Sequence, residues 1–443
     1  MRITRSKLFT ALPAVILAGG ATAHAQAPAP DTTFIFNTLL FLIMGMVVMF
    51  MAAGFCMLEA GSVRAKNTAA ICLKNITLYS IAGLMVWLCG YNMIYGIEEG
   101  GYVNNLLENN VWSADDSDPL GTGYSAGSDW FFQMVFVATA ASIVSGTLAE
   151  RIRVWPFFIF TAILTGFIYP IQASWEWGAG WLDAKGFSDF AGSTLVHATG
   201  GWAALAGAIA LGARKGKYDG TVEKHEFYGA SMPLATLGVF ILWLGWFGFN
   251  GGSQLALGSL DDSIAVSDIF IHTNMAAASG VVTVVVLSTL LLGKISLPLA
   301  LNGAIGGLVS ITAEPLMPDP VMDSILLAVI IGAIGGTLVF LVTPLLDALR
   351  IDDVVGAIPA HLACGIWGTL VVPLSNKEVS IIAQGTGVLA NAGFVFGVSL
   401  VLWFFLKFTI GIRSTAEHED VGLDIAETGA PGINIVKAHY PAE

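Results

Sequence analysis

Long stretches without charged residues alternate with short polar segments along nearly the whole chain. No Asp, Glu, Lys or Arg occurs between Thr32 and Leu58, and the stretch from 269 to 293 is similar. A helix needs about 20 apolar residues to cross a bilayer. The pattern therefore predicts an all-α membrane protein with eleven transmembrane helices. The helix near Gly307 has the weakest signal. Their approximate centres are Val47, Ala82, Val137, Ala162, Ala204, Gly238, Thr283, Gly307, Ile331, Ile366 and Gly397.

The first 25 residues have a different organisation. Three basic residues lie among the first seven, an apolar run extends from Leu8 to Leu17, and Ala23-His24-Ala25 follows. This order is typical of a signal peptide that is removed after export. We therefore expect residues 1–25 to be a signal peptide, residues 26–412 to form the membrane domain, and residues 413–443 to be a cytoplasmic tail.

The basic residues between the predicted helices lie almost entirely on one side of the membrane. The alternate set of loops contains only Lys185 and Lys377. Since cytoplasmic loops carry the excess of Lys and Arg, the N-terminus is predicted to lie outside and the C-terminus inside, as an exported start and an odd number of helices also require. The residues of the basic set are Arg64, Lys66, Lys74, Arg151, Arg153, Arg214, Lys215, Lys217, Lys224, Lys294, Arg350, Lys407, Arg413 and Lys437.

Composition and charge argue against several classes of function. The chain is 55% hydrophobic and 12% charged, with about half the charged fraction of a soluble domain. Its formal charge of −13 argues against a nucleic-acid partner. The four cysteines lack the spacing of a disulfide framework or a zinc site, and no cofactor motif is visible. We expect no enzymatic activity, and the predicted tail is too short for a kinase or cyclase domain.

Two predicted helices contain a histidine followed four residues later by a glycine. His197 precedes Gly201 in "DFAGSTLVHATGG", and His361 precedes Gly365 in "IPAHLACGIWG". The first of these helices runs inward and the second outward, which predicts an inverted repeat of helices one to five and six to ten, with the eleventh added. In transporters built from such repeats, solutes bind near the membrane midplane at the repeat interface.

The histidines allow more than one interpretation. An intramembrane histidine often bonds a neighbouring helix, and two imidazoles can ligate a b-type haem. The glycine-rich surroundings favour close helix packing, which brings the rings into near contact and leaves little room for a porphyrin. Interhelical bonding and a role in a solute path both remain open from the residues alone. Asp189, at the outer start of the first helix, is typical of a helix cap.

Six motifs in order resemble the ammonium transporter family, which is related to the Rh proteins. The resemblance covers essentially the whole chain after the signal peptide, and six ordered motifs are far more specific than any one of them. It implies eleven helices per subunit, a pore through each subunit and a homotrimer. The motifs are "GFCMLEAGSVRAKN" (54–67), "GTLAERIR" (146–153), "DFAGSTLVH" (189–197), "GWFGFNGGS" (245–253), "DDVVGAIPAHLACGIWG" (352–368) and "GLD" (422–424).

The resemblance also implies roles for individual residues. Phe132, Trp177 and Ser253 correspond to an outer substrate-binding site that Asp189 supports. Phe136 and Phe249 correspond to a pore gate, and His197 and His361 to the pore histidines. The chain departs from the family pattern in three places. Some relatives have Phe-Tyr-Gly-Gly where this chain has Leu58-Glu59-Ala60-Gly61, many have an aspartate in place of Gly356, and relatives often have a histidine where the tail has Thr428.

The chemistry of ammonium fits these residues. A desolvated cation–π contact contributes about 2 kcal/mol, whereas a charge at the membrane centre costs at least about 2.5 to 3.5 kcal/mol. Attraction at the mouth therefore cannot carry the intact ion across. Neutral ammonia needs only hydrogen-bond partners, which imidazoles supply, and potassium has no proton to lose.

Two classes of function follow from this reading. The first is a transporter or channel for ammonium, and for methylammonium, in the plasma membrane, which is expected to be a bacterial inner membrane. The alternative is an ammonium sensor that signals to a cytoplasmic partner. The resemblance also implies docking of a PII-type regulatory protein on the cytoplasmic face. The sequence does not decide whether a proton accompanies the ammonia.

Overall fold

The computed structural model describes residues 30–96, 101–102, 111–223 and 227–433. The predicted signal peptide, residues 1–25, lies outside these ranges, as do the last ten residues of the predicted tail. Within the described residues the chain is helical and forms no β-strand beyond two isolated bridges, Ile152 with Arg413 and Asp319 with Asn376.

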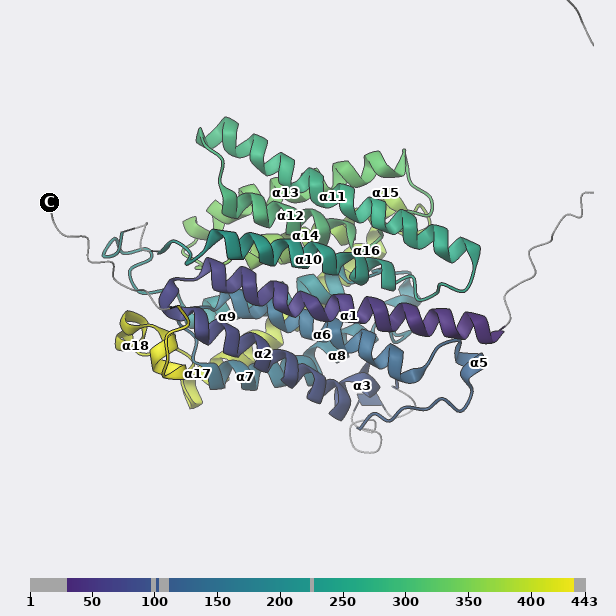
Figure 1. Cartoon of the computed structure of the whole chain (residues 1–443), viewed down its shortest axis with the longest axis horizontal. Helices are drawn as coiled ribbons and strands as arrows, with labels where there is room; N and C mark the ends of the chain where they lie inside the picture. The colour runs from purple at the N-terminus through teal and green to yellow at the C-terminus, as the bar shows by residue number, and fades with distance from the viewer. Residues whose placement is uncertain (1–29, 97–100, 103–110, 224–226, 434–443) are drawn as a thin grey trace, which may run out of the picture.

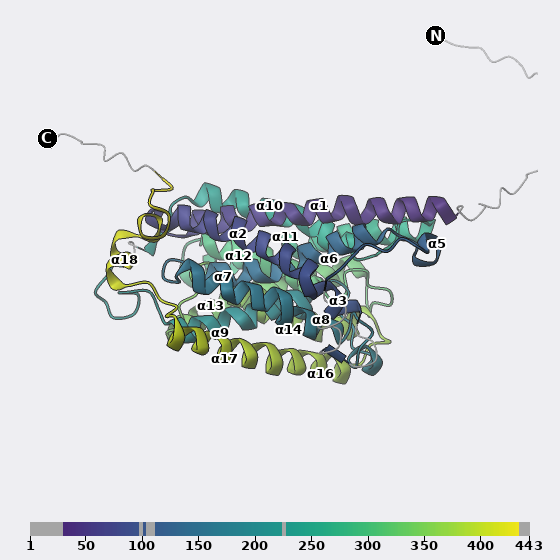
Figure 2. The same cartoon turned by 90° about the horizontal axis from the view of Figure 1, so that it is seen from below.

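The longer helices lie side by side across the molecule (Figures 1 and 2). They are α1 (Pro30–Ser62), α2 (Thr68–Met85), α6 (Ala126–Thr147), α7 (Val154–Ile163), α9 (Thr199–Leu211), α10 (Met232–Gly252), α11 (Leu260–Leu292), α12 (Leu297–Ile311), α13 (Ser324–Ala348), α16 (Ile381–Asn391) and α17 (Gly397–Thr409). The shorter ones are α3 (Tyr91–Tyr95), α5 (Pro119–Thr122), α8 (Tyr169–Ser174), α14 (Cys364–Leu370), α15 (Val372–Ser375), α18 (Ala416–Val421), and the 3₁₀ helices η1 (Ala65–Asn67) and η4 (Asp183–Lys185).

Several helices contain π-helical turns. Three of these turns join two helices end to end, namely η2 (Val86–Gly90), η3 (Leu164–Ile168) and η8 (Ala392–Phe396). Two others begin a helical segment: η5 (Ser193–Ala198) leads into α9 and η7 (Ile358–Ala363) leads into α14. A further one, η9 (Asp424–Thr428), follows α18. A π turn widens the helix by one residue and is frequent at functional sites. The two turns η5 and η7 each contain one of the predicted pore histidines.

Each of the eleven predicted helix centres falls within a helix of the structure. Among the described residues, nine helical segments have the length and apolar composition to cross a membrane. The segments around the other two centres are shorter: α12 has 15 residues, and η7 continues into α14. The structure therefore shows a membrane protein of many helices, and the count of eleven stays a prediction.

Large apolar side chains cover the outside of the helix bundle. Phe240, Val282, Val401 and Phe408 are each at least 60% exposed, and they lie on α10, α11 and α17. A surface of this kind is stable in lipid rather than in water. Many polar side chains are instead buried inside the bundle, among them His197, His361 and Glu59.

The two ends of the bundle differ in character. The first residues of α1 lie near α5 at one end, and α18 lies at the opposite end (Figure 1). We refer to these as the α5 end and the α18 end. The charge distribution predicts that the α5 end faces outward and the α18 end faces the cytoplasm.

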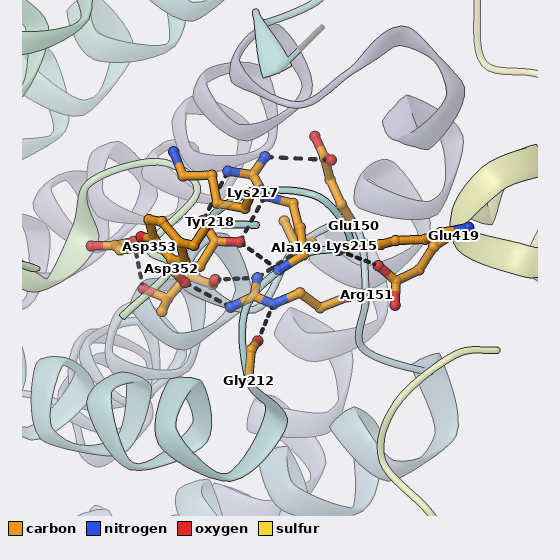
Figure 3. Close-up of polar contacts among 12 residues, drawn as sticks. Ala149, Glu150, Arg151, Gly212, Lys215, Lys217, Tyr218, Asp352, Asp353 and Glu419 are labelled. Atoms are coloured by element: carbon orange, nitrogen blue, oxygen red, sulfur yellow. Dashed lines mark hydrogen bonds and ion pairs between the residues drawn. The ribbon is translucent and has the colours of Figure 1, made fainter. Parts of the chain in front are cut away.

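A network of ion pairs and hydrogen bonds closes the α18 end. Arg214 Nε lies 2.8 Å from Asp352 Oδ2, and Arg151 donates to the backbone oxygens of Gly212 and Asp352 (Figure 3). Glu150 pairs with Arg64 at 2.6 Å and with Arg214 at 3.4 Å. Although burial acts to raise it, the neighbouring guanidinium groups of Arg151 and Arg214 hold the pKa of Asp352 well below its usual range.

The described part of the predicted tail packs against this network. Glu419 accepts hydrogen bonds from Arg413 Nε and the Lys215 backbone amide, at 2.7 and 3.0 Å. Asp424, the last residue of the "GLD" motif, accepts from the Ala70 amide at 2.9 Å. These contacts tie the tail to the start of α2 and to the loop that follows α9.

Candidate functional site

The two predicted pore histidines lie in direct contact at the centre of the bundle. His361 Nδ1 and His197 Nδ1 are 3.3 Å apart, and the ring centroids are 5.3 Å apart with an interplanar angle of 30°. Both side chains are buried. Because the rings are within hydrogen-bond distance of each other, there is no room between them for a haem iron, and the haem interpretation does not fit this geometry.

Glycines allow the two histidine-bearing segments to approach so closely. A Cβ atom at Gly201 would lie 2.9 Å from the backbone nitrogen of Leu362, which follows His361. A Cβ atom at Gly365 would lie 3.1 Å from the backbone nitrogen of Ala198, which follows His197, and 2.4 Å from Ser193 O. The relationship is reciprocal, since each glycine packs against the residue that follows the histidine of the other segment.

The ring of His197 is fixed by aromatic neighbours, but one of its nitrogens is unpaired. Its centroid lies 4.9 Å from that of Trp246, whose Nε1 donates to Thr312 Oγ1 at 2.8 Å. The Nε2 atom of His197 is buried and has no hydrogen-bond partner within the described part of the chain. A buried polar atom without a partner is unfavourable, so this position favours a small solute that can donate or accept a hydrogen bond.

The predicted gate residues form a stacked pair next to His197. The rings of Phe136, on α6, and Phe249, on α10, have centroids 3.9 Å apart and an interplanar angle of 18°. The Phe249 centroid lies 5.3 Å from that of His197. Both phenylalanines are buried, so the pair closes the way from the α5 end to the histidines.

A pocket of about 390 Å³ lies on the other side of the phenylalanine pair, toward the α5 end. Phe132, Phe136, Trp177 and Ser253, four of the residues singled out in the sequence, line it together. The remaining lining residues are Tyr91, Tyr95, Tyr124, Asp129, Gln133, Phe190 and Leu255. The pocket, the phenylalanine pair and the histidine pair thus follow one another along one line into the bundle.

Residues 39–433 match the model of the Ammonium Transporter Family. The chain belongs to this family. A putative ammonium transporter of Synechocystis, sll1017, is 39% identical over 95% of this chain and 94% of its own. Ammonium transporter Amt2 of Archaeoglobus fulgidus is 38% identical over 93% of this chain and 90% of its own.

Solved structures agree with the family assignment. A structure titled Sensor Amt Protein superposes with a TM-score of 0.79 and is 33% identical over 90% of this chain and 100% of that chain. The crystal structure of Saccharomyces cerevisiae Mep2 superposes with a TM-score of 0.75 over 93% of this chain and 94% of that chain, but at 23% identity it supports the fold alone.

Within this ammonium transporter family fold, Asp189 does not line the pocket. Its Oδ1 accepts from the amides of Gly192 and Ser193, and its Oδ2 from those of Thr194 and Leu195, at 2.8 to 3.0 Å. Burial raises its pKa to about 6, while these four amides act in the opposite direction. Asp189 therefore caps the start of η5, and it contacts the pocket indirectly, because its backbone oxygen accepts a hydrogen bond from Trp177 Nε1 at 3.0 Å.

The pocket also contains a carboxylate that sequence reasoning missed. Asp129, in the first turn of α6, lines the pocket and accepts a hydrogen bond from the hydroxyl of Tyr91. Its position one helical turn before Phe132 was the available signal, but many other acidic residues are predicted to lie at the same end of the molecule. Only the fold shows which of these acidic residues borders the pocket.

One departure from the family pattern has a local explanation. Gly356 has a φ angle of +80°, in the region that favours glycine, and a Cβ atom there would lie 2.4 Å from Asn302 Nδ2.

Within the described ranges, no group of three His, Cys, Asp or Glu side chains is placed to hold a metal ion.

Proposed function

We propose that this chain carries ammonium-derived nitrogen across the plasma membrane through the line of pocket, phenylalanine pair and histidine pair. The observation that supports this most directly is the unpartnered, buried Nε2 atom of His197 immediately behind the phenylalanine pair. Such an atom suits a small solute with hydrogen-bonding capacity. The proposal extends the family assignment to a specific route and to specific residues.

The pocket at the α5 end provides the features that attract a small cation. Aromatic faces attract its charge, the Ser253 hydroxyl has capacity to accept a hydrogen bond, and the carboxyl group of Asp129 adds a further acceptor to the wall. This gain of about 2 kcal/mol from a desolvated aromatic contact is smaller than the cost of moving a charge to the membrane centre. Ammonium therefore gives up a proton before the nitrogen passes the phenylalanine pair.

Neutral ammonia then meets the histidine pair. Each neutral imidazole offers one donor and one acceptor nitrogen, and the contact between the two Nδ1 atoms uses one position of each ring. The Nε2 atom of His197 remains for the solute. Potassium lacks a proton that it could lose, so it retains its charge and is rejected by the apolar path.

We further propose a homotrimeric assembly in a bacterial inner membrane, with eleven transmembrane helices and the α18 end in the cytoplasm. The basic residues at the α18 end suit docking of a PII-type regulatory protein. An ammonium sensor is the second candidate, and the similarity to a solved structure titled Sensor Amt Protein favours it. A sensor would bind ammonium without supporting net flux, which distinguishes it from a transporter.

Uptake into proteoliposomes tests the transport proposal. Ammonium or methylammonium flux should be saturable and should exceed that of protein-free liposomes, while current is recorded at the same time. Because the sequence contains no visible binding motif for a metal or a nucleotide, adding a chelator and omitting ATP should leave the flux unchanged at a fixed gradient. Loss of flux under either treatment, or saturable binding without flux, would contradict the proposal.

Replacement of Trp177 by leucine tests the pocket. The change removes the ring face but keeps an apolar side chain, so apparent affinity should weaken more than maximal flux. Loss of about 2 kcal/mol corresponds to a shift of up to about 30-fold in half-saturating ammonium concentration. Trp181→Leu is the matched control, because Trp181 is 43% exposed and packs against Trp175 outside the pocket. Equal concentration dependence in both variants would remove Trp177 from the binding site.

A further inference from the structure

A second, much smaller cavity touches His361. Its free volume is about 10 Å³, which is enough for about one water-sized molecule, and ammonia is of that size. The cavity is mainly apolar, being lined by residues such as Phe55, Leu58 and Ile305, and Glu59 is the one carboxylate among its lining residues. A solute that leaves the histidine pair toward the α18 end therefore meets Glu59.

The carboxylate of Glu59 is buried and incompletely satisfied. The residue lies on α1 and is 1% exposed. Its Oε2 atom accepts a hydrogen bond from Ser145 Oγ at 2.7 Å, whereas its Oε1 atom has no hydrogen-bond partner within the described residues. A buried carboxylate oxygen without a donor calls for a proton or for a ligand that donates one.

Lys74 offsets the charge of Glu59 only in part. Its ammonium group donates to the backbone oxygen of Ser145 at 2.9 Å and lies 5.0 Å from the ring centroid of Phe157. It is near enough to act electrostatically on Glu59, but no ion pair within 4.0 Å joins the two in the described chain. Asn75 also lies beside this carboxylate, but its Nδ2 atom donates to the backbone oxygen of Ile71 at 3.1 Å rather than to Oε1. The thiols of Cys56 and Cys72 are the remaining polar groups nearby. The attraction between Glu59 and Lys74 therefore does not explain why the Oε1 atom of Glu59 has no hydrogen-bond donor.

We propose that Glu59 is the proton-donating group on the α18 side of the pore. In this step the protonated carboxyl group transfers its proton to ammonia in the small cavity, which forms ammonium and leaves the carboxylate. Ammonium departs toward the α18 end, and the proton released in the outer pocket restores the carboxyl group by way of the histidine pair. One ammonium ion enters and one leaves, so charge and atoms balance. The inference rests on the proposed function, and it adds the place where the neutral solute regains its charge.

The isosteric substitution Glu59→Gln tests this step. The glutamine keeps an oxygen that accepts from Ser145 but provides no carboxyl proton. In proteoliposomes with an inward ammonium gradient and a pH-sensitive dye inside, the current should fall at least tenfold. Neutral ammonia that still passes will take up protons in the lumen, so the lumen should become more alkaline than with the unaltered protein. Glu59→Asp, which restores a carboxyl group, should recover part of the current.

A double variant separates the proton-donating role from a merely structural one. Glu59→Gln leaves Lys74 without a nearby negative charge, and this alone can impair folding. Glu59→Gln combined with Lys74→Met removes both charges, so a folded protein is expected, and its current should stay low. Recovery of the unaltered protein's current in the double variant would assign Glu59 to charge compensation and overturn the proposal.

A matched control variant tests whether the expected effect is specific to Glu59. Glu314→Gln is the matched control, because Glu314 is a buried carboxylate that accepts from Asn376 and lines neither cavity of the path. Its current and lumenal pH response should equal those of the unaltered protein.

Two outcomes distinguish failure of this inference from failure of the proposed function. Absence of saturable uptake by the unaltered protein would contradict the transport proposal itself. Uptake with an unchanged current in Glu59→Gln, or uptake without any current, would contradict only the role of Glu59.

Discussion

Potassium currents should appear when His197 is replaced by aspartate. A fixed carboxylate behind the phenylalanine pair lowers the cost of an intact cation at the membrane centre. Offsetting a cost of about 2.5 to 3.5 kcal/mol corresponds to an increase of about 70- to 400-fold in the rate of cation passage. Proteoliposomes with matched potassium and ammonium gradients provide the measurement, with size-exclusion chromatography to verify that the assembly remains intact.

The neutral substitution His197→Gln is the control for this experiment. Glutamine can still bond a neighbouring group, but it places no charge in the pore, so potassium should remain excluded. A role of His197 in helix contact alone predicts a different result. In that case His197→Asp would destabilise the assembly, since a buried carboxylate without a partner is penalised whichever solute is present. An intact assembly with unchanged flux and continued exclusion of potassium would contradict the proposed role.

Replacement of Asp352 by alanine should strongly destabilise the α18 end. The Asp352 carboxylate accepts from the backbone amide, Nε and Nη2 of Arg214 at 2.8 to 2.9 Å, and both side chains are almost fully buried. Its loss leaves the Arg214 guanidinium with Glu150 at 3.4 Å as its remaining ion pair. Breaking a buried pair in this way costs about 3 to 5 kcal/mol, which thermal unfolding in detergent should detect as a large fall in midpoint temperature.

An exposed pair in the same region provides the control for Asp352→Ala. Lys215 and Asp420 form an ion pair of 2.7 Å, but their side chains are 48% and 61% exposed. Because water and salt screen such a pair, Asp420→Ala should cost only about 0 to 1 kcal/mol. Equal midpoints for the two variants would show that the Arg214 network does not stabilise this end.

The same network has a predictable dependence on pH. The pKa of Asp352 is held below its unfolded value, which is about 3.9, by Arg151 and Arg214. A depressed pKa contributes stability that is complete above the unfolded value and is lost as pH falls through the folded one. The stabilisation by Asp352 should therefore be constant between pH 5 and 8, and the difference between Asp352→Ala and the unaltered protein should shrink only below about pH 4.

The apolar pattern predicted the helices well because the length of a membrane-crossing helix is set by the bilayer. Every predicted centre lies in a helix, including the weak one at Gly307 in α12. The π turns at His197 and His361 had no such signal. Local composition specifies an apolar helix, but whether it widens by one residue depends on the helices packed against it.

The candidate site was predicted in part. The family resemblance named both histidines and the phenylalanine pair, although Phe136 lies outside the six motifs, and the fold brings each of these pairs into contact. The position of Asp189 at the start of a predicted helix indicated correctly that it is a helix cap. The hydrogen bond from Trp177 Nε1 to its backbone oxygen, which links it to the pocket, could not be predicted from the sequence. The spacing of the cysteines in the sequence did not indicate that the Sγ atoms of Cys56 and Cys72, both free thiols, lie 3.7 Å apart. The two residues lie on different helices, so only the packing of these helices brings them together.

The sequence by itself determined that this chain is a helical membrane protein of the ammonium transporter family, because hydrophobic length and ordered motifs are properties of the chain in one dimension. Only the tertiary structure decided which acidic residues border the pocket and the small cavity. Asp129 and Glu59 are separated along the chain from the histidines, and their position in the wall of one of the two cavities described above distinguishes them. Burial and hydrogen-bond satisfaction depend on packing between helices, so the free Oε1 atom of Glu59 and the free Nε2 atom of His197 could be recognised only in three dimensions.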